Sequence, residues 1–135
     1  MPSKIFPGKF SSLEKISDFV TKHADASGLD ENATYAVQLA VDEACSNIIE
    51  HAYGGEGQGD IECACNILDD GLEIILRDTG KPFNPKDVQQ IKIGVPIEEL
   101  GSRGAGIYLI KKLMDEVIFE FSKNEGTTLK LKKKK

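Results

Sequence analysis

Three polar side chains recur every four residues in an otherwise apolar stretch of the sequence. They are Glu43, Asn47 and His51, and a four-residue spacing brings side chains to one face of an α-helix. The carboxylate can accept a proton and the amide oxygen can bind a hard divalent cation, as phosphoryl-transfer chemistry requires. The solvated edge of an amphipathic helix would show the same spacing, so this feature alone leaves both interpretations open.

Two further features have the residue types of a ligand site. A carboxylate and a glycine follow an apolar run at residues 78–83 (DTGKPF), where the glycine lets a second backbone or a ligand come close. Gly101, Gly104 and Gly106 then lead into renewed helical spacing, and the N–H groups and dipole of a helix start attract anions. The first feature also fits a simple turn, and a lone glycine pattern is weak evidence for a ligand.

The hydrophobic pattern before these features predicts two helices. The first starts at a capping box, residues 11–14 (SSLE), and ends at Gly28. The second starts after Asp30 and ends at the glycine pair 54–55, and the width of its apolar stripe indicates deep packing. This second helix carries the three polar residues described first.

From Asp60 the hydrophobic period changes to two, the period of a strand. It predicts strands at residues 60–68 and 72–77 joined by a tight turn. A helix at 107–114 and strands at 117–121 and 127–131, joined by a turn at 124–126, follow. Prolines and glycines between residues 79 and 102 predict a long loop with at most a short helix at 87–91, and such loops are typical of lids. Together these elements predict an α/β fold, a two-layer sandwich with helices on one face of a mixed, mostly antiparallel sheet.

The composition fits one folded domain of 135 residues, with 40% hydrophobic and 29% charged residues. A net charge of -5 disfavours binding to nucleic acid, and we interpret the lysines at 132–135 as a frayed, solubilising end. Cys45, Cys63 and Cys65 fit no disulfide framework. Together with His51, the last two would leave a zinc site one ligand short, so we expect reduced, buried thiols. The sequence has neither an apolar run long enough for a membrane span nor a signal-peptide pattern, which predicts a cytoplasmic protein.

The order of these motifs resembles that of the GHKL ATPases, which include histidine kinases, DNA gyrase B and MutL. Residues 43–53 (EACSNIIEHAY) resemble the N box, residues 78–83 the first glycine box and residues 101–110 (GSRGAGIYLI) the second. Residues 126–129 (GTTL) resemble the strand start that closes the adenine pocket. The resemblance covers the chain from about residue 42 to residue 131 and implies an ATP-binding fold of the Bergerat type.

This resemblance implies roles for the residues that would contact the cation, the attacking hydroxyl and the adenine ring. Asn47 would hold Mg²⁺, and Glu43 would act as the general base of phosphoryl transfer. Asp78 would accept a hydrogen bond from the adenine amino group, with Gly80 leaving room for the ring and Thr128 assisting.

At the phosphates, the resemblance implies that Gly104 and Gly106 cradle the anion with their N–H groups. Arg103 would stabilise charge on the terminal phosphate and so act as a catalytic residue. The remaining contacts to ATP that we predict come from His51, Phe83, Gly101 and Ala105.

Two details of the sequence are similar to those of one group within this family, the bacterial anti-sigma-factor serine kinases of the RsbW and SpoIIAB type. The first glycine box continues with Pro82 and Phe83 instead of the commoner glycine, and residues 113–117 (LMDEV) follow the second box. Such kinases use ATP and Mg²⁺, bind a sigma factor as homodimers and phosphorylate a STAS-domain antagonist, so we expect these partners here. The alternatives are a switch kinase of the RsbT type and a non-catalytic module whose partner affinity responds to ATP.

Overall fold

A computed structural model of the chain describes residues 1–82, 102–122 and 126–135. The elements in chain order are β1 (Ser3–Pro7), a 3-10 turn (Phe10–Ser12), α1 (Leu13–Ser27), α2 (Glu31–Asn47), a π-helical turn (Ile48–Ala52), β2 (Asp60–Leu68), β3 (Gly71–Asp78), α4 (Ser102–Leu113), β4 (Glu116–Ser122) and β5 (Gly126–Lys134). The predicted helix at 87–91 and the turn residues 124 and 125 lie outside the described residues.

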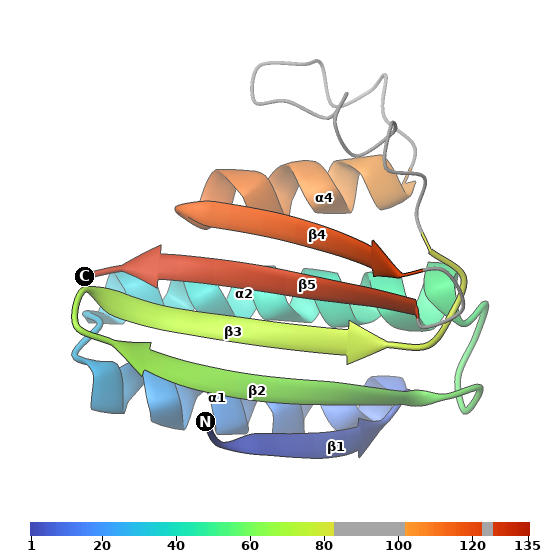
Figure 1. Cartoon of the computed structure of the whole chain (residues 1–135), viewed down its shortest axis with the longest axis horizontal. Helices are drawn as coiled ribbons and strands as arrows, with labels where there is room; N and C mark the ends of the chain where they lie inside the picture. Colours follow the sequence, from blue (N-terminus) through green and yellow to red (C-terminus); the bar gives the residue numbers. More distant parts are fainter. Residues whose placement is uncertain (83–101, 123–125) are drawn as a thin grey trace.

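The strands form one sheet in the order β1-β2-β3-β5-β4, and the helices α1, α2 and α4 cover one of its faces (Figure 1). All four pairings between described strands are antiparallel, where the sequence predicted a mixed, mostly antiparallel sheet. The predicted two-layer α/β sandwich is confirmed. Because β5 lies between β3 and β4, the end of β3 and the start of β5 are neighbours, as the pairing of Asp78 with Thr127 shows.

The two predicted helices form, but their starts differ. Asp30 caps α2, because its carboxylate accepts a hydrogen bond of 2.8 Å from the N–H of Ala33. The capping box predicted for α1 is wrong: no side chain caps this helix, which instead continues from the 3-10 turn before it. Its predicted end at Gly28 is confirmed, and φ there is 86°, a conformation that favours glycine.

A π-helical turn follows directly on α2. In it the N–H of Tyr53 donates to the carbonyl of Ile48, five residues earlier, at 2.9 Å. Such a turn is wider than an α-helical one and is common at functional sites. The regular four-residue spacing therefore holds from Glu43 to Asn47 and does not extend to His51.

The edge strand β1 was absent from the sequence prediction. Only Phe6 of its five residues is buried, so the segment shows no alternation of apolar and polar residues. Pro7 ends it, as proline is tolerated at a sheet edge. The strand is nevertheless paired with β2 over its whole length, from Ser3 opposite Ala64 to Pro7 opposite Asp60.

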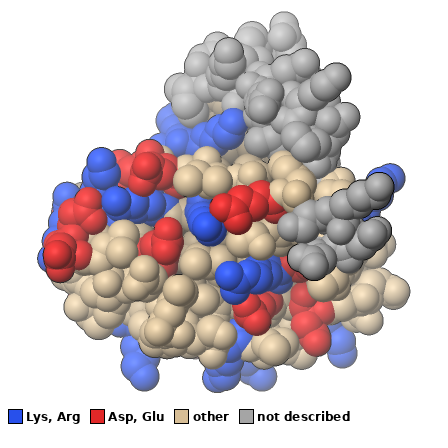
Figure 2. All heavy atoms as spheres, in the orientation of Figure 1, with Lys and Arg blue, Asp and Glu red and all other residues tan. Residues whose placement is uncertain are grey.

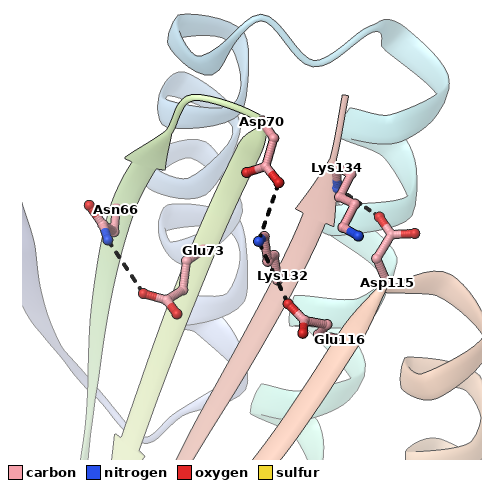
Figure 3. Close-up of polar contacts among 7 residues, drawn as sticks. All are labelled: Asn66, Asp70, Glu73, Asp115, Glu116, Lys132 and Lys134. Atoms are coloured by element: carbon pink, nitrogen blue, oxygen red, sulfur yellow. Dashed lines mark hydrogen bonds and ion pairs between the residues drawn. The ribbon is translucent and has the colours of Figure 1, made fainter.

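The prediction that residues 132–135 form a frayed end is wrong, because β5 continues to Lys134. The ammonium of Lys132 lies 3.4 Å from Asp70 and 3.7 Å from Glu116, and the N–H of Lys134 donates to Asp115 at 2.7 Å (Figure 3). Asp70 follows β2, Asp115 precedes β4, and Glu116 is the first residue of β4. The lysines are thus held by complementary charge and by strand pairing.

The other face of the sheet is not covered by helices in the described residues. Lysine and arginine side chains lie beside acidic ones across it (Figure 2). Two of these contacts are ion pairs, between Arg77 and Glu62 at 2.6 Å and between Lys130 and Glu120 at 2.9 Å. Within the part of the chain that the structure describes, the helices are too short or too polar to cross a membrane.

Candidate active site

A cavity opens between α2, α4 and the sheet. Part of it is open to solvent, and its walls are mainly apolar. The lining residues are Ala44, Asn47, Ile48, Asp78, Arg103, Ile107, Ile110, Phe119, Thr127 and Leu129. An apolar cleft with a few polar groups is typical of a binding site for a flat organic ring.

Asp78 brings a carboxylate into this cavity at the end of β3. Its side chain is 6% exposed, and the N–H of Gly80 donates to its Oδ1 at 3.0 Å. Burial raises the pKa of Asp78, while the Gly80 hydrogen bond and the charge of Arg103 lower it. The result is a fixed acceptor facing the cavity.

Gly80 allows the backbone after Asp78 to pass very close to the π-helical turn. A Cβ atom at Gly80 would overlap the carbonyl of Ala52, and the N–H of Lys81 donates to that carbonyl at 2.7 Å. The sequence predicted a glycine that admits a second backbone or a ligand, and the neighbour is a backbone. Ala52 fills the space where a Cβ atom of Gly80 would lie, and room for a ring beside Gly80 stays a prediction.

The threonine at the cavity is Thr127, not Thr128. Thr127 pairs with Asp78 across the sheet and lies on the same face, whereas Thr128 pairs with Arg77 on the opposite face. The Thr127 hydroxyl is buried and has no hydrogen-bond partner in the described residues. Period-two alternation from the buried Leu129 and Leu131 would have identified Thr127 from the sequence.

Glu43 and Asn47 meet α4 at Gly106. A Cβ atom at Gly106 would lie 2.7 Å from Nδ2 of Asn47 and 3.0 Å from Oε2 of Glu43, so the absence of a side chain lets the two helices pack closely. The Asn47 Nδ2 atom is buried without a hydrogen-bond partner among the described residues. The predicted pairing of a carboxylate and an amide on one face of α2 is therefore present.

Arg103 lies in the first turn of α4 and lines the cavity. It is near enough to Asp78 for the two charges to act on each other, and this attraction opposes the burial that lowers the pKa of Arg103. The structure thus brings predicted site residues together from three elements: Asp78 at the end of β3, Arg103 on α4, and Glu43 and Asn47 on α2.

The predicted glycine series lies within α4 rather than before it. The helix begins at Ser102 instead of residue 107, so Gly104 and Ala105 lie in its first turn or just after it. The first N–H groups of a helix lack partners within the helix, which keeps phosphate binding by this turn a prediction. The predicted site residues Phe83 and Gly101, and residues 83–101 of the predicted lid, lie outside the described residues.

His51 and the cysteines are separate from the cavity lining. His51 lies in the π-helical turn, with Nε2 3.9 Å from a Glu50 carboxylate oxygen. Cys45, Cys63 and Cys65 are free and buried, as predicted, and burial raises the pKa of the Cys45 thiol. Among the described residues, no three His, Cys, Asp or Glu side chains gather as metal ligands.

Comparison with known proteins gives a family match for this chain. A family model described as "Histidine kinase-like ATPase domain" matches residues 6–133 of the chain. The match includes every element that lines the cavity, and it agrees with the resemblance to GHKL ATPases that the sequence motifs indicated.

Individual relatives are similar over part of their length. Proteins named serine-protein kinase RsbW from Bacillus velezensis and Bacillus pumilus are 34% and 38% identical over 102 and 103 residues. Each alignment covers 72% of this chain and 62% of the relative, so the chain matches about three fifths of these proteins. A solved histidine kinase domain, from the blue-light activated histidine kinase of Erythrobacter litoralis EL346, has the same fold. It gives a TM-score of 0.59 at 14% identity and covers 96% of this chain and 61% of that chain.

Proposed function

The chain belongs to the family of histidine kinase-like ATPase domains, and on this premise we propose that it is an ATP-dependent protein serine/threonine kinase. ATP would bind in the cavity at Asp78, and its terminal phosphate would pass to a serine or threonine hydroxyl of another protein. The similarity to proteins named serine-protein kinase RsbW supports this acceptor class.

The observation that carries the proposal is the buried carboxylate of Asp78 in an apolar cavity. Adenine is flat and apolar on both faces, and its 6-amino group donates hydrogen bonds. The walls of Ile107 and Phe119 suit the ring, and Asp78 offers an acceptor at the cavity edge. The unpartnered hydroxyl of Thr127 beside Asp78 supplies a second polar contact for the base.

Asn47 and Glu43 suit the magnesium end of a bound nucleotide. Mg²⁺ prefers oxygen ligands in an octahedral arrangement and bridges phosphate oxygens, which neutralises their charge. The Asn47 side chain lies against Gly106 of α4, and its amide oxygen is a hard, neutral donor of the kind that Mg²⁺ takes. The hard donors at this position fit Mg²⁺.

Glu43 and Arg103 would carry the transfer step. Glu43 lies one helical turn before Asn47 and would accept the proton of the attacking hydroxyl. Arg103 at the start of α4 would stabilise the negative charge on the transferred group. In the structure the negative charge of Asp78 favours the charged form of Arg103 and so raises its pKa, against the lowering by burial.

We extend the proposal to the partners that the sequence resemblance implies. The protein would bind a sigma factor as a homodimer and phosphorylate a STAS-domain antagonist. Phosphorylation would add negative charge at the antagonist's interface and thereby release it.

A phosphate-transfer assay tests the activity directly. With γ-labelled ATP, Mg²⁺ and a STAS-domain protein from the same genome, the wild type should label the acceptor on serine or threonine. Glu43→Ala should bind ATP normally and lose transfer by about a hundredfold or more, because a general base contributes at least that much.

Glu31→Ala, at an exposed position in the first turn of α2, provides the matched control and should transfer phosphate normally. Wild-type transfer by Glu43→Ala would refute the assigned base. ATP binding without any transfer by the wild type would favour a non-catalytic module.

A further inference from the structure

Tyr53 connects the π-helical turn to the strand ends beside the cavity. Its hydroxyl donates to the carbonyl of Asp60 at 2.5 Å and accepts from the N–H of Thr79 at 3.0 Å. Asp60 begins β2 and Thr79 directly follows Asp78. One phenol therefore joins the start of one strand to the end of the next.

The position of the Tyr53 ring is fixed by glycine backbone beneath it. A Cβ atom at Gly59 would overlap the ring and lie 2.9 Å from the hydroxyl oxygen. At Gly8 a Cβ atom would lie 3.5 Å from Cδ2 of the ring. The ring is thus confined on this side, which gives its hydroxyl a defined position.

A second contact holds the same segment from the preceding residue. The carbonyl of Ala52 accepts from the N–H of Lys81 at 2.7 Å. Consecutive residues, Ala52 and Tyr53, therefore bind the backbone at Lys81 and Thr79. The two contacts lie on either side of Gly80, which passes against the Ala52 carbonyl.

The carboxylate of Asp78 depends on this backbone for its orientation. Its Oδ1 accepts from the N–H of Gly80 at 3.0 Å, and the peptide that carries this N–H lies between the two anchored residues. A rotation of the Thr79–Gly80 backbone would therefore rotate the acceptor that faces the cavity.

We infer that Tyr53 is a positioning residue for base recognition: it fixes the segment after Asp78 so that the carboxylate accepts a hydrogen bond from position six of a purine. This inference rests on the proposed function. Tyr53 is not among the residues that line the cavity, so it would act through Asp78. It belongs to the helical segment that also carries Asn47, so the same segment would align the base and the cation.

Base selectivity provides the test, because a merely structural role would leave it unchanged. Inosine triphosphate carries an oxygen where ATP carries the 6-amino group, so calorimetric titration with ATP and with inosine triphosphate measures recognition at this position. Tyr53→Phe keeps the ring and removes the hydroxyl. The wild type should prefer ATP, and Tyr53→Phe should reduce this preference roughly three- to tenfold, as loss of about one hydrogen bond implies.

Two further variants make the result specific. Tyr35→Phe removes a hydroxyl from a tyrosine on α2 that is 61% exposed, and it should leave the preference unchanged. In the Asp78→Asn background, adding Tyr53→Phe should have no further effect on selectivity, because Tyr53 affects selectivity only through the Asp78 carboxylate.

Measurements on the wild type keep the inference testable if Tyr53→Phe does not fold. The Thr79 amide should exchange slowly with solvent in the nucleotide-free protein, because it donates to Tyr53. Fast exchange there would overturn the inference, as would an unchanged ATP preference in Tyr53→Phe. A wild type without any preference for ATP would instead refute the proposed function.

Discussion

Asp78 is an ionisable residue that the fold places where ionisation is unfavourable. It is almost fully buried, and burial raises the pKa of this carboxyl above its ordinary value of 3.8. The hydrogen bond from the Gly80 N–H and the charge of Arg103 offset part of this increase in the pKa. A group held this way costs stability in the empty protein, and under the proposed function its binding to adenine would compensate for that cost.

We predict that Asp78→Asn stabilises the nucleotide-free protein at neutral pH. The raised pKa means that the contribution of Asp78 is most favourable below pH 3.8 and is lost as the pH rises through the folded-state pKa. The amide cannot ionise and avoids this loss, so urea unfolding should show a higher midpoint for the variant at neutral pH and a shrinking difference toward acid.

Asp69→Asn, in the exposed turn after β2, is the control and should not change the midpoint. A wild type that is more stable than Asp78→Asn at neutral pH would show that the carboxylate is a net stabilising group.

At the residue scale the sequence predicted several residues that the structure places close together, but it named Thr128 where the cavity is lined by Thr127. Glu43, Asn47 and Asp78 are in motifs whose spacing is local, within one helix or at one strand end, so their neighbours along the chain define them. Thr128 was predicted from its motif, but the face of β5 on which a threonine lies determines whether it lines the cavity. Alternation with the buried Leu129 and Leu131 indicates the face of Thr127, but its position beside Asp78 follows from the register, which depends on pairing with a distant strand.

At the scale of elements, the contact between α2 and α4 determines how Glu43 and Asn47 lie relative to α4. Gly106 lies against Asn47 and Glu43 with no room for a side chain. The distances from Asn47 and Glu43 to α4 therefore depend on how closely the two helices pack. Close packing of two helices at a glycine thus brings the first turns of α4 to the polar face of α2.

We predict that Gly106→Ala displaces the side-chain ends of Asn47 and Glu43, and overpacking of this kind usually costs about 1–3 kcal/mol. Alanine has a better helix propensity by roughly 1 kcal/mol, so the measured loss should be the difference between the two effects. Denaturant unfolding measures it, and phosphate transfer should fall as well.

Lys112→Ala, at an exposed site on the same helix, should change neither property. Full stability and full transfer in Gly106→Ala would show that the helices have more space than the structure indicates.

Elements with a strong hydrophobic period were predictable, and elements held by distant contacts were not. Strand β2 alternates over residues 60–63, and β3 is a mostly buried run, as its apolar sequence predicted. Strand β1 has one buried residue and exists because it pairs with β2. The lysines of β5 gave no apolar signal, yet Asp70 and Glu116 hold Lys132 from two other parts of the chain.

At the scale of the whole molecule, the cavity is a product of strand order. Its lining comes from α2, the π-helical turn, β3, α4, β4 and β5, and β5 inserts between β3 and β4. This insertion places residues 127 and 129 beside β3, although about fifty residues separate them from Asp78 in the sequence. The sequence predicted the two layers, but the order of the strands follows only from the folded sheet.

The central claim is that the cavity at Asp78 receives the adenine of ATP, and calorimetric titration with ATP and with GTP in the presence of Mg²⁺ tests it most directly. GTP carries an acceptor oxygen at position six, which would face the Asp78 carboxylate without a hydrogen bond at a cost of about 1–3 kcal/mol. The account predicts ATP binding at least roughly fivefold tighter than GTP binding, with the difference reduced in Asp78→Asn. Equal affinity of the wild-type protein for the two nucleotides would contradict it.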